Sequence, residues 1–270
     1  MKHRITLFVD VRERMDEYAQ ALGVTPEQAN EAFEWMLAND VAFQEGETQY
    51  AISSLDIEHA IEPELPRRFY GVLKRELGIK LLPLYGYNWA TFFDRVRRCW
   101  EQVYNMLINK IPFHCVRLAW LRLGGAKIGK GSTIWRNTEV IGMENLVIGE
   151  DSVVAWHCQI DARAGVRIGD HVTIASYVQI IPGGHDAMSP EFWGVCKPIV
   201  IEDYAWITTR AMILQGGYIG RGAVVTANTV ITKEIAPYKI VGGIGAKVMG
   251  ERPHNLNYKV GGKSLFTFLH

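Results

Sequence analysis

The chain lacks the features that mark secreted and membrane-spanning proteins. Its 270 residues include only four cysteines, and no two of them form a CxxC pair. Scattered cysteines without a regular framework are typical of a reduced, cytosolic protein. No run approaches the roughly 18 uncharged apolar residues that a membrane-spanning helix needs. Residues 1–10 are charged and mixed, which argues against a signal peptide, so we expect a cytoplasmic protein.

The chain also has no net charge, but its charges are unevenly distributed. It contains 29 basic and 29 acidic residues. Residues 1–66 hold 14 acidic against 4 basic side chains, and residues 67–130 hold 13 basic against 3 acidic ones. The remaining residues are balanced. Such blocks indicate distinct surfaces and partners, and they divide the chain into three zones.

What the sequence does contain is a six-residue repeat. Branched aliphatic residues recur at this spacing, and the frame slips by two residues twice, as turn insertions would make it do. A period of six fits neither an α-helix nor simple strand alternation. It suits a triangular coil of about 18 residues, in which each hexad supplies one short strand and one tight corner. The repeat positions are Ile128, Ile134, Val140, Leu146, Ile148, Val154, Ile160, Val166, Ile168, Ile174, Ile180, Ile201, Ile207, Ile213, Ile219, Val225 and Ile231.

These positions predict a parallel β-helix over residues 124–252. Ordinary short strands with chance spacing are the alternative, which the six consecutive matches from Ile201 to Ile231 disfavour. The repeat is broken once, between Ile180 and Ile199, by a segment rich in proline and glycine. A long loop that leaves a rigid scaffold is a typical functional site, so residues 181–198 are the candidate catalytic loop.

The candidate catalytic residue of this loop is His185. Histidine changes charge near neutral pH and therefore suits general base catalysis. A solvent-exposed histidine without a function is the alternative. The position of His185 in the one long break of the repeat favours the catalytic role.

Five stretches of the repeat region resemble the hexapeptide-repeat acetyltransferases, nearest to the maltose, galactoside and capsular or exopolysaccharide O-acetyltransferases. They are residues 183–186, 197–201, 205–207, 230–237 and 241–248. The resemblance implies a left-handed parallel β-helix, with a mostly α-helical region before it. It also implies an acetyl-CoA-dependent O-acetyltransferase that forms a homotrimer, with active sites between adjacent β-helices.

The resemblance also implies roles for individual residues. His185 would be the general base on an acceptor hydroxyl, and Asp186 would either orient His185 or cap the loop. Thr209 lies where the family uses a backbone amide to stabilise the oxyanion. Coenzyme A carries several phosphates, which lysine can bind, although surface lysines without a ligand are the simpler explanation. The implied cofactor-binding residues are Trp206, Thr209, Ala227, Thr232, Lys233 and Lys247.

The sequence departs from the family on the acceptor side. Ala155 stands where the maltose and galactoside enzymes carry asparagine, and Arg163 replaces an acidic residue near the acceptor. His157 and Arg163 are therefore acceptor candidates that suit an anionic sugar. We expect O-acetylation of a polysaccharide or its lipid-linked precursor. N-acylation of a sugar nucleotide or small amine is an alternative, and a β-helical scaffold without activity is another.

No metal site is expected. The metal-dependent β-helical relatives use a histidine pair five residues apart, which this sequence does not contain. His157, His171 and His185 are instead spaced by fourteen residues.

Residues 1–66 are expected to form an acidic helix–helix–hairpin module similar to a winged helix. Asp10 to Leu22 is amphipathic, Thr25 begins a capping box for a helix to about Asn39, and residues 41–52 predict a hairpin. The second helix has no Lys or Arg, so nucleic-acid binding is not expected.

Residues 67–123 predict a basic, aromatic helical region. Its aromatic side chains either pack the helices onto the β-helix or form a cationic surface. Such a surface would dock on the inner membrane or hold an acidic glycan. Residues 253–270 form a C-terminal tail.

Overall fold

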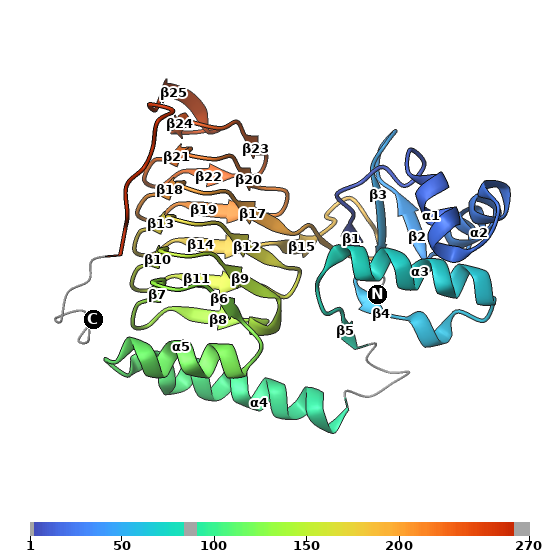
Figure 1. Ribbon diagram of the computed structural model, residues 1–270, viewed down its shortest axis with the longest axis horizontal. Coiled ribbons are helices and arrows are strands. Elements are labelled where there is room, and N and C mark those ends of the chain that lie inside the picture. Colours follow the sequence, from blue (N-terminus) through green and yellow to red (C-terminus); the bar gives the residue numbers. More distant parts are fainter. Residues whose placement is uncertain (1–2, 84–90, 262–270) are drawn as a thin grey trace. The chain divides into compact units, whose positions relative to one another are not determined.

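The structure, a computed structural model, describes residues 3–83 and 91–261. The chain forms two compact units (Figure 1). The N-terminal unit comprises residues 1–91 together with residues 184–197, and the β-helix unit comprises residues 92–183 and 198–270. A segment from the middle of the repeat therefore belongs to the N-terminal unit.

The β-helix unit consists of short strands stacked in three sheets (Figure 1). The first sheet contains β7 (Thr133–Ile134), β10 (Val153–Val154), β13 (Thr173–Ile174), β18 (Trp206–Ile207), β21 (Val224–Val225), β24 (Lys239–Gly242) and β25 (Lys247–Glu251). The second contains β8 (Glu139–Ile141), β11 (Gln159–Asp161), β14 (Gln179–Ile181), β19 (Met212–Leu214) and β22 (Val230–Ile231). The third contains β6 (Lys127–Ile128), β9 (Leu146–Ile148), β12 (Val166–Ile168), β17 (Ile199–Ile201), β20 (Tyr218–Ile219) and β23 (Glu234–Ile235). Among the described strands of these three sheets, β24 and β25 alone pair antiparallel, so the predicted parallel β-helix is confirmed.

Equivalent aliphatic residues of successive coils pair in register. In the second sheet Ile160 pairs with Ile180, Ile180 with Ile213, and Ile213 with Ile231. All four side chains are fully buried. Burial of one such side chain contributes about 1.5–3 kcal/mol, so a continuous column of them forms the core of the unit.

The coils differ in length. Hydrogen-bonded residues of neighbouring coils are 20 positions apart in the early coils and 18 apart in the later ones. The extra two residues explain the two slips in the sequence frame. Across the coil that contains the candidate catalytic loop, the separation is 33 positions.

The corners between strands use residues with positive φ. One ladder of equivalent corners has φ between 57° and 64° and consists of Asn137, His157, Tyr177, Arg210 and Asn228. Left-handed backbone is unfavourable for residues other than glycine. Here the N–H groups of Tyr177, Arg210 and Asn228 donate to carbonyls of the preceding coil, and these hydrogen bonds offset the cost.

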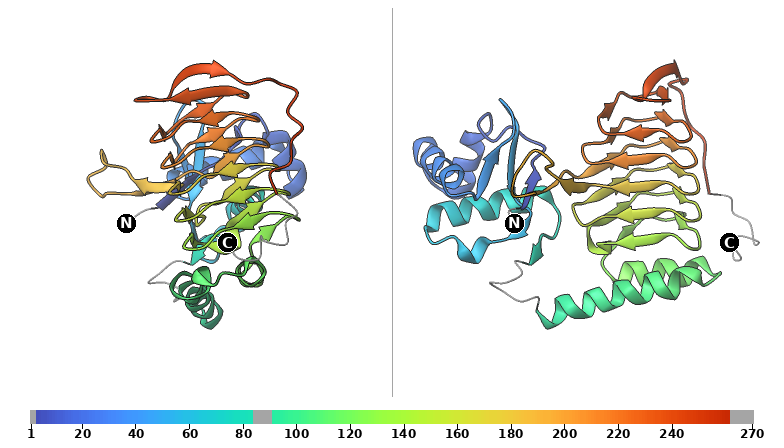
Figure 2. Two further views of the ribbon diagram at one scale, coloured as in Figure 1. Left: turned by 90° about the vertical axis from the view of Figure 1, so that its left-hand side faces the viewer. Right: turned by 180° about the vertical axis from the view of Figure 1, so that it is seen from behind.

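Two helices and a short 3-10 helix cover the first coil: α4 (Phe92–Met106), η2 (Ile108–Lys110) and α5 (His114–Leu123) (Figures 1 and 2). Arg117 is fully buried and donates two hydrogen bonds to the carbonyl of Ile134, at 3.0 and 2.9 Å. Trp100 and Trp120 stack with ring centroids 3.7 Å apart, and each indole N–H donates to the other residue's carbonyl. Part of the basic aromatic region therefore packs on the β-helix, while residues 84–90 lie outside the described residues.

The N-terminal unit combines helices with a five-stranded sheet of order β15-β16-β1-β3-β2. Both halves of the predicted capping box at Thr25 are present, and β2 and β3 form the predicted hairpin. The strand β1 was not predicted. The expected boundary after residue 66 falls inside α3, which packs against α1 and α2. The elements are β1 (His3–Thr6), α1 (Met15–Leu22), α2 (Pro26–Ala38), β2 (Ala42–Gln44), β3 (Tyr50–Ser53), β4 (Leu55–Asp56), η1 (Glu58–Ala60), α3 (Glu64–Leu77), β5 (Leu82–Pro83), β15 (Gly183–His185) and β16 (Gly194–Cys196).

Among residues 3–83 and 91–261, no helix is long and apolar enough to cross a membrane.

The last described residues run back along the corners of the β-helix (Figure 1). Arg252 donates to the carbonyls of Tyr204 and Gly222 at 3.0 and 3.2 Å. The N–H groups of Val260 and Gly261 donate to the carboxylate of Asp151 at 2.7 and 2.9 Å. The tail is thereby attached to an early coil.

Asp151 also accepts a hydrogen bond from His171, whose Nδ1 lies 2.8 Å from the carboxylate. Partial burial opposes ionisation of Asp151, but the hydrogen bonds from His171, Val260 and Gly261 lower its pKa overall. The charged form of Asp151 therefore stabilises the attached tail.

Replacement of Asp151 by Asn should release the tail, because the amide has one acceptor oxygen where the carboxylate has two. We expect trypsin to cleave after the exposed Lys259 several-fold faster at neutral pH.

A lowered native pKa of Asp151 stabilises the fold above the ordinary aspartate value of about 4, and this stabilisation is lost as the pH falls through the native pKa. The difference in Tm between the wild type and Asp151→Asn should therefore shrink below about pH 4.

Asp170→Asn is the matched control, because that carboxylate accepts the Glu150 N–H of a neighbouring coil and no hydrogen bond from the described tail residues up to 261. Equal cleavage of the two variants, or a Tm difference that persists at low pH, would contradict the role of Asp151.

Candidate active site

The candidate catalytic loop is a β-hairpin. Its strands β15 and β16 are neighbours in the sheet of the N-terminal unit. The N–H of Asp186 donates to the carbonyl of Trp193 at 2.8 Å, which closes the hairpin. The sequence predicted a protruding loop over residues 181–198 but not its pairing.

His185 lies on this hairpin and is exposed. Its ring stacks on Phe192 with centroids 4.1 Å apart and an interplanar angle of 4°. Its Nδ1 lies 3.1 Å from the carbonyl oxygen of Phe192. Because a carbonyl can only accept, Nδ1 carries the proton in this arrangement and Nε2 keeps its lone pair. The geometry suits a general base, and no sequence pattern indicated the role of Phe192.

Asp186 caps the turn of the hairpin. Its carboxylate accepts the N–H of Met188 at 3.0 Å and a hydrogen bond from Arg4 at 3.1 Å. Among the described residues it makes no hydrogen bond to His185. Of the two roles considered for Asp186, this geometry favours capping.

The N-terminal strand approaches the hairpin closely. β1 pairs in parallel with β16, with His3 opposite Gly194. A Cβ atom on residue 194 would lie 2.3 Å from Nδ1 of His3, so a larger residue there would force the His3 ring to move. Burial lowers the pKa of His3, and the nearby His185 adds to the lowering. His3 therefore tends to remain neutral beside His185.

Four of the predicted cofactor-binding residues lie along one edge of the β-helix. Trp206 belongs to β18 and is 46% exposed, and Thr209 lies at the corner that follows. Asn228 donates to the Thr209 carbonyl at 3.2 Å, which places Ala227 at the equivalent corner of the next coil. Lys247 pairs with Gly242, which approaches the Thr226 side chain beside the same corner. We call Trp206, Thr209, Ala227 and Lys247 the donor edge.

The other two predicted residues, Thr232 and Lys233, follow β22 and are exposed. Ala227 precedes β22 in the chain, whereas Thr232 and Lys233 follow it, so they lie at the other end of that strand. The structure therefore brings four of the six residues to one edge and places two at the next corner.

The acceptor candidates His157 and Arg163 lie before and after β11, at opposite ends of one short strand. His157 occupies a left-handed corner and stacks on Tyr177 with centroids 5.0 Å apart. Arg163 forms an ion pair with Asp161 at 2.6 Å. Both side chains thus have contacts within the β-helix.

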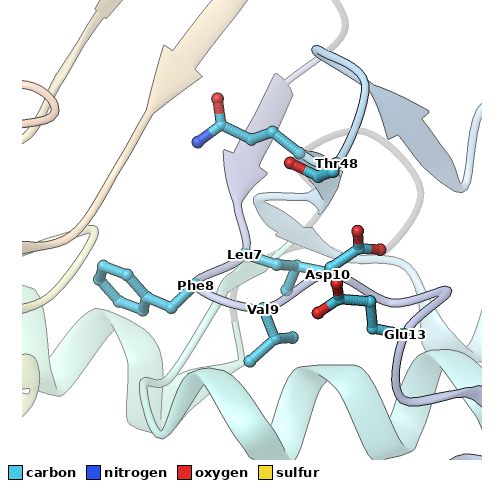
Figure 3. A pocket seen from close by; sticks show the side chains of 7 residues that line it. Leu7, Phe8, Val9, Asp10, Glu13 and Thr48 are labelled. Carbon is cyan, nitrogen blue, oxygen red and sulfur yellow. The ribbon is translucent and has the colours of Figure 1, made fainter.

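Among residues 3–83 and 91–261, no three His, Cys, Asp or Glu side chains cluster as metal ligands would. A cavity of about 430 Å³ in the N-terminal unit is shown in Figure 3. None of the predicted site residues lines it. The cavity is lined by Leu7, Phe8, Val9, Asp10, Glu13, Thr48 and Gln49.

No protein-family model matches the chain. The Escherichia coli protein WcaF, which carries the name of a colanic acid biosynthesis acetyltransferase, is 31% identical over 132 residues. This match covers 49% of the chain and 72% of WcaF. A chloramphenicol acetyltransferase of Agrobacterium fabrum is 42% identical over 118 residues, covering 41% of this chain and 54% of that protein.

The fold is similar to a solved hexapeptide-repeat acetyltransferase of Vibrio cholerae in complex with acetyl coenzyme A. The TM-score is 0.56 at 27% identity, over 61% of this chain and 92% of that chain. This similarity and the parallel stacking of short strands in three sheets confirm the predicted left-handed β-helix. The resemblance to exopolysaccharide and galactoside acetyltransferases is confirmed as well. With the six-residue repeat, the left-handed coil and the match over most of WcaF, the chain belongs to the hexapeptide-repeat acetyltransferases.

Proposed function

We propose that the protein transfers the acetyl group of acetyl-CoA to a carbohydrate hydroxyl, with His185 as the general base. The observation that carries this proposal is the hydrogen bond between Nδ1 of His185 and the Phe192 carbonyl, which leaves Nε2 free to take a proton. The exposure of His185 supports it, because the acceptor must reach that nitrogen.

In this mechanism Nε2 of His185 removes the proton of the acceptor hydroxyl as its oxygen attacks the thioester carbonyl. The attack produces a tetrahedral oxyanion, to which the Thr209 N–H donates. The oxyanion collapses, the carbon–sulfur bond breaks, and the thiolate of coenzyme A takes the proton from His185. The histidine returns to its starting state, and an acetyl ester and free coenzyme A leave.

The donor edge supports acetyl-CoA as the donor. Trp206 offers an exposed apolar face beside Thr209, which suits an acyl group. The small side chain of Ala227 leaves room for the cofactor at the adjacent corner. Lys247 adds a positive charge that can bind a phosphate. Thr232 and Lys233 would contact coenzyme A only if the ligand extends to the next corner.

The acceptor proposal is a polysaccharide hydroxyl or its lipid-linked precursor, which the similarity to WcaF supports. His157 and Arg163 stay predictions for the acceptor side. The similarity to a chloramphenicol acetyltransferase favours a small alcohol as the second candidate. An acceptor panel therefore needs oligosaccharides, amino sugars and chloramphenicol.

We also propose a homotrimer. The left-handed β-helix presents three flat sheets, and closed symmetric assemblies of such rigid units are common. Trimer formation would place a neighbouring subunit against the donor edge and complete the site.

A further proposed partner is an anionic membrane surface, such as the inner membrane. The outer face of α4 carries exposed apolar side chains at helical spacing, namely Phe92, Val96, Cys99, Val103 and Met106. The opposite face carries the buried Tyr104. Residues 92–123 contain six basic side chains, of which Arg117 is buried, and two acidic ones, so the remaining excess of positive charge complements anionic lipid. A cytoplasmic location stays a prediction.

Replacement of His185 by Gln should lower kcat by about 10²- to 10⁴-fold, because general base catalysis contributes about that much. The KM for acetyl-CoA should change little, since the donor edge is untouched. The measurement is release of coenzyme A thiol with the best acceptor of the panel. His254→Gln is the control, because His254 is an exposed histidine paired with Glu251 in the tail region. Full activity of His185→Gln would refute the role of His185 as the general base.

Light scattering should give a mass about three times that of the 270-residue chain. A monomer with full activity would exclude the shared site.

Vesicles that contain phosphatidylglycerol should sediment the protein at low salt, and about 0.5 M salt should release it, because screening weakens charge attraction. Val96→Glu with Met106→Glu should abolish sedimentation. Ile244→Glu is the control and should not affect sedimentation, because Ile244 is an apolar residue that is 97% exposed but lies outside α4. Equal binding of these variants, or binding only to neutral lipid, would contradict the proposal.

A further inference from the structure

We infer that the N-terminal unit positions the catalytic hairpin, and that Arg4 is a positioning residue that acts on His185 through Asp186. This inference rests on the proposed role of His185. It assigns a function to the acidic module, whose purpose the sequence did not indicate.

The first link is between backbones. β1 lies between β16 and β3 in the five-stranded sheet, so the hairpin is the outer part of a sheet whose other strands belong to residues 3–53. An isolated two-stranded hairpin is only marginally stable in water. Its pairing with β1 supplies the additional strand that such a hairpin needs. Gly194 lets the His3 ring lie directly against this strand, because a Cβ atom at residue 194 would lie 2.3 Å from Nδ1 of His3.

The second link is the guanidinium of Arg4, which lies between two carboxylates. It contacts Asp186 of the hairpin at 3.1 Å and Glu45 of the N-terminal unit at 3.1 Å. The three side chains are only 17–29% exposed, so solvent screens these contacts less than it would on an open surface. Arg4 therefore joins the hairpin to the turn that follows β2.

The third link is an aromatic contact. Trp193 meets Phe43 edge to face, with ring centroids 5.6 Å apart. The Arg4 guanidinium lies 5.5 Å from the centre of the Trp193 ring. Arg4 thus contacts the residue that follows β15 and the residue that precedes β16.

The anchors lie next to the catalytic group in the chain. Asp186 directly follows His185, and Trp193 directly follows Phe192, whose carbonyl and ring hold the imidazole. A shift of Asp186 or Trp193 therefore moves His185 or the group that orients it. Misplacement of a catalytic group by about 1 Å can cost about a hundredfold in rate.

The test compares Arg4→Gln, Arg4→Lys and Arg12→Gln in the 270-residue chain. Arg4→Gln should lower kcat about tenfold with both KM values unchanged, since it moves the base and not the donor edge. Arg4→Lys keeps the charge and should recover most of the activity. Arg12→Gln is the matched control, because Arg12 also pairs with a carboxylate, Glu34, and lies over the Phe33 ring without contact to the hairpin. It should keep kcat within about twofold.

A double variant separates positioning from general stability. If Arg4 acts through His185, Arg4→Gln should lower the residual rate of His185→Gln no further. Amide hydrogen exchange over residues 183–197 should rise several-fold in Arg4→Gln and stay unchanged in Arg12→Gln. An additional tenfold loss in the His185→Gln background would overturn the inference, as would unchanged exchange in Arg4→Gln.

These outcomes also distinguish the inference from the proposed function. Full activity of His185→Gln refutes the base, whereas hydrogen exchange still reports whether Arg4 holds the hairpin. An inactive His185→Gln together with a fully active Arg4→Gln refutes the positioning role alone.

Discussion

The in-register stacking of inward aliphatic side chains is the constraint on which the β-helix unit depends. Ile180 pairs with Ile213 although the hairpin intervenes between them, so the core column continues across the insertion. Extra residues cannot be inserted into a column whose members already contact each other. Insertions are therefore accommodated at the corners between strands. The two extra residues of each early coil and the much longer hairpin are both placed at corners for this reason.

The chain therefore holds its candidate groups in two physically different ways. The donor edge consists of exposed side chains on strands and corners whose neighbours are buried, so its geometry follows from the coil. The hairpin of His185 contributes no described residue to the core cluster that contains the aliphatic column. It is instead held by backbone pairing with β1, by the Arg4 ion pairs and by the contact of Trp193 with Phe43. A rigid coil and a separately anchored base give independent routes by which mutations could alter donor binding and catalysis.

Local patterns predicted the β-helix and much of the N-terminal unit. The hexad period, the Thr25 capping box and the hairpin of β2 and β3 each depend on residues close together in the chain. The break in the repeat also located His185. His157 shows the limit of such patterns, because none of them predicted that it occupies a left-handed corner in the same ladder as Asn137 and Tyr177.

The sequence by itself determined the coil, the family and the candidate base, because periodic burial and corner conformation repeat locally. Only the tertiary structure decided how that base is held. Arg4 and Asp186 are 182 positions apart, and no periodicity links them. Phe192 acts through its backbone carbonyl, which every residue possesses, so its type carries no signal. Contacts of this kind depend on which strand edges meet in the folded chain, and that is settled by the packing of whole elements.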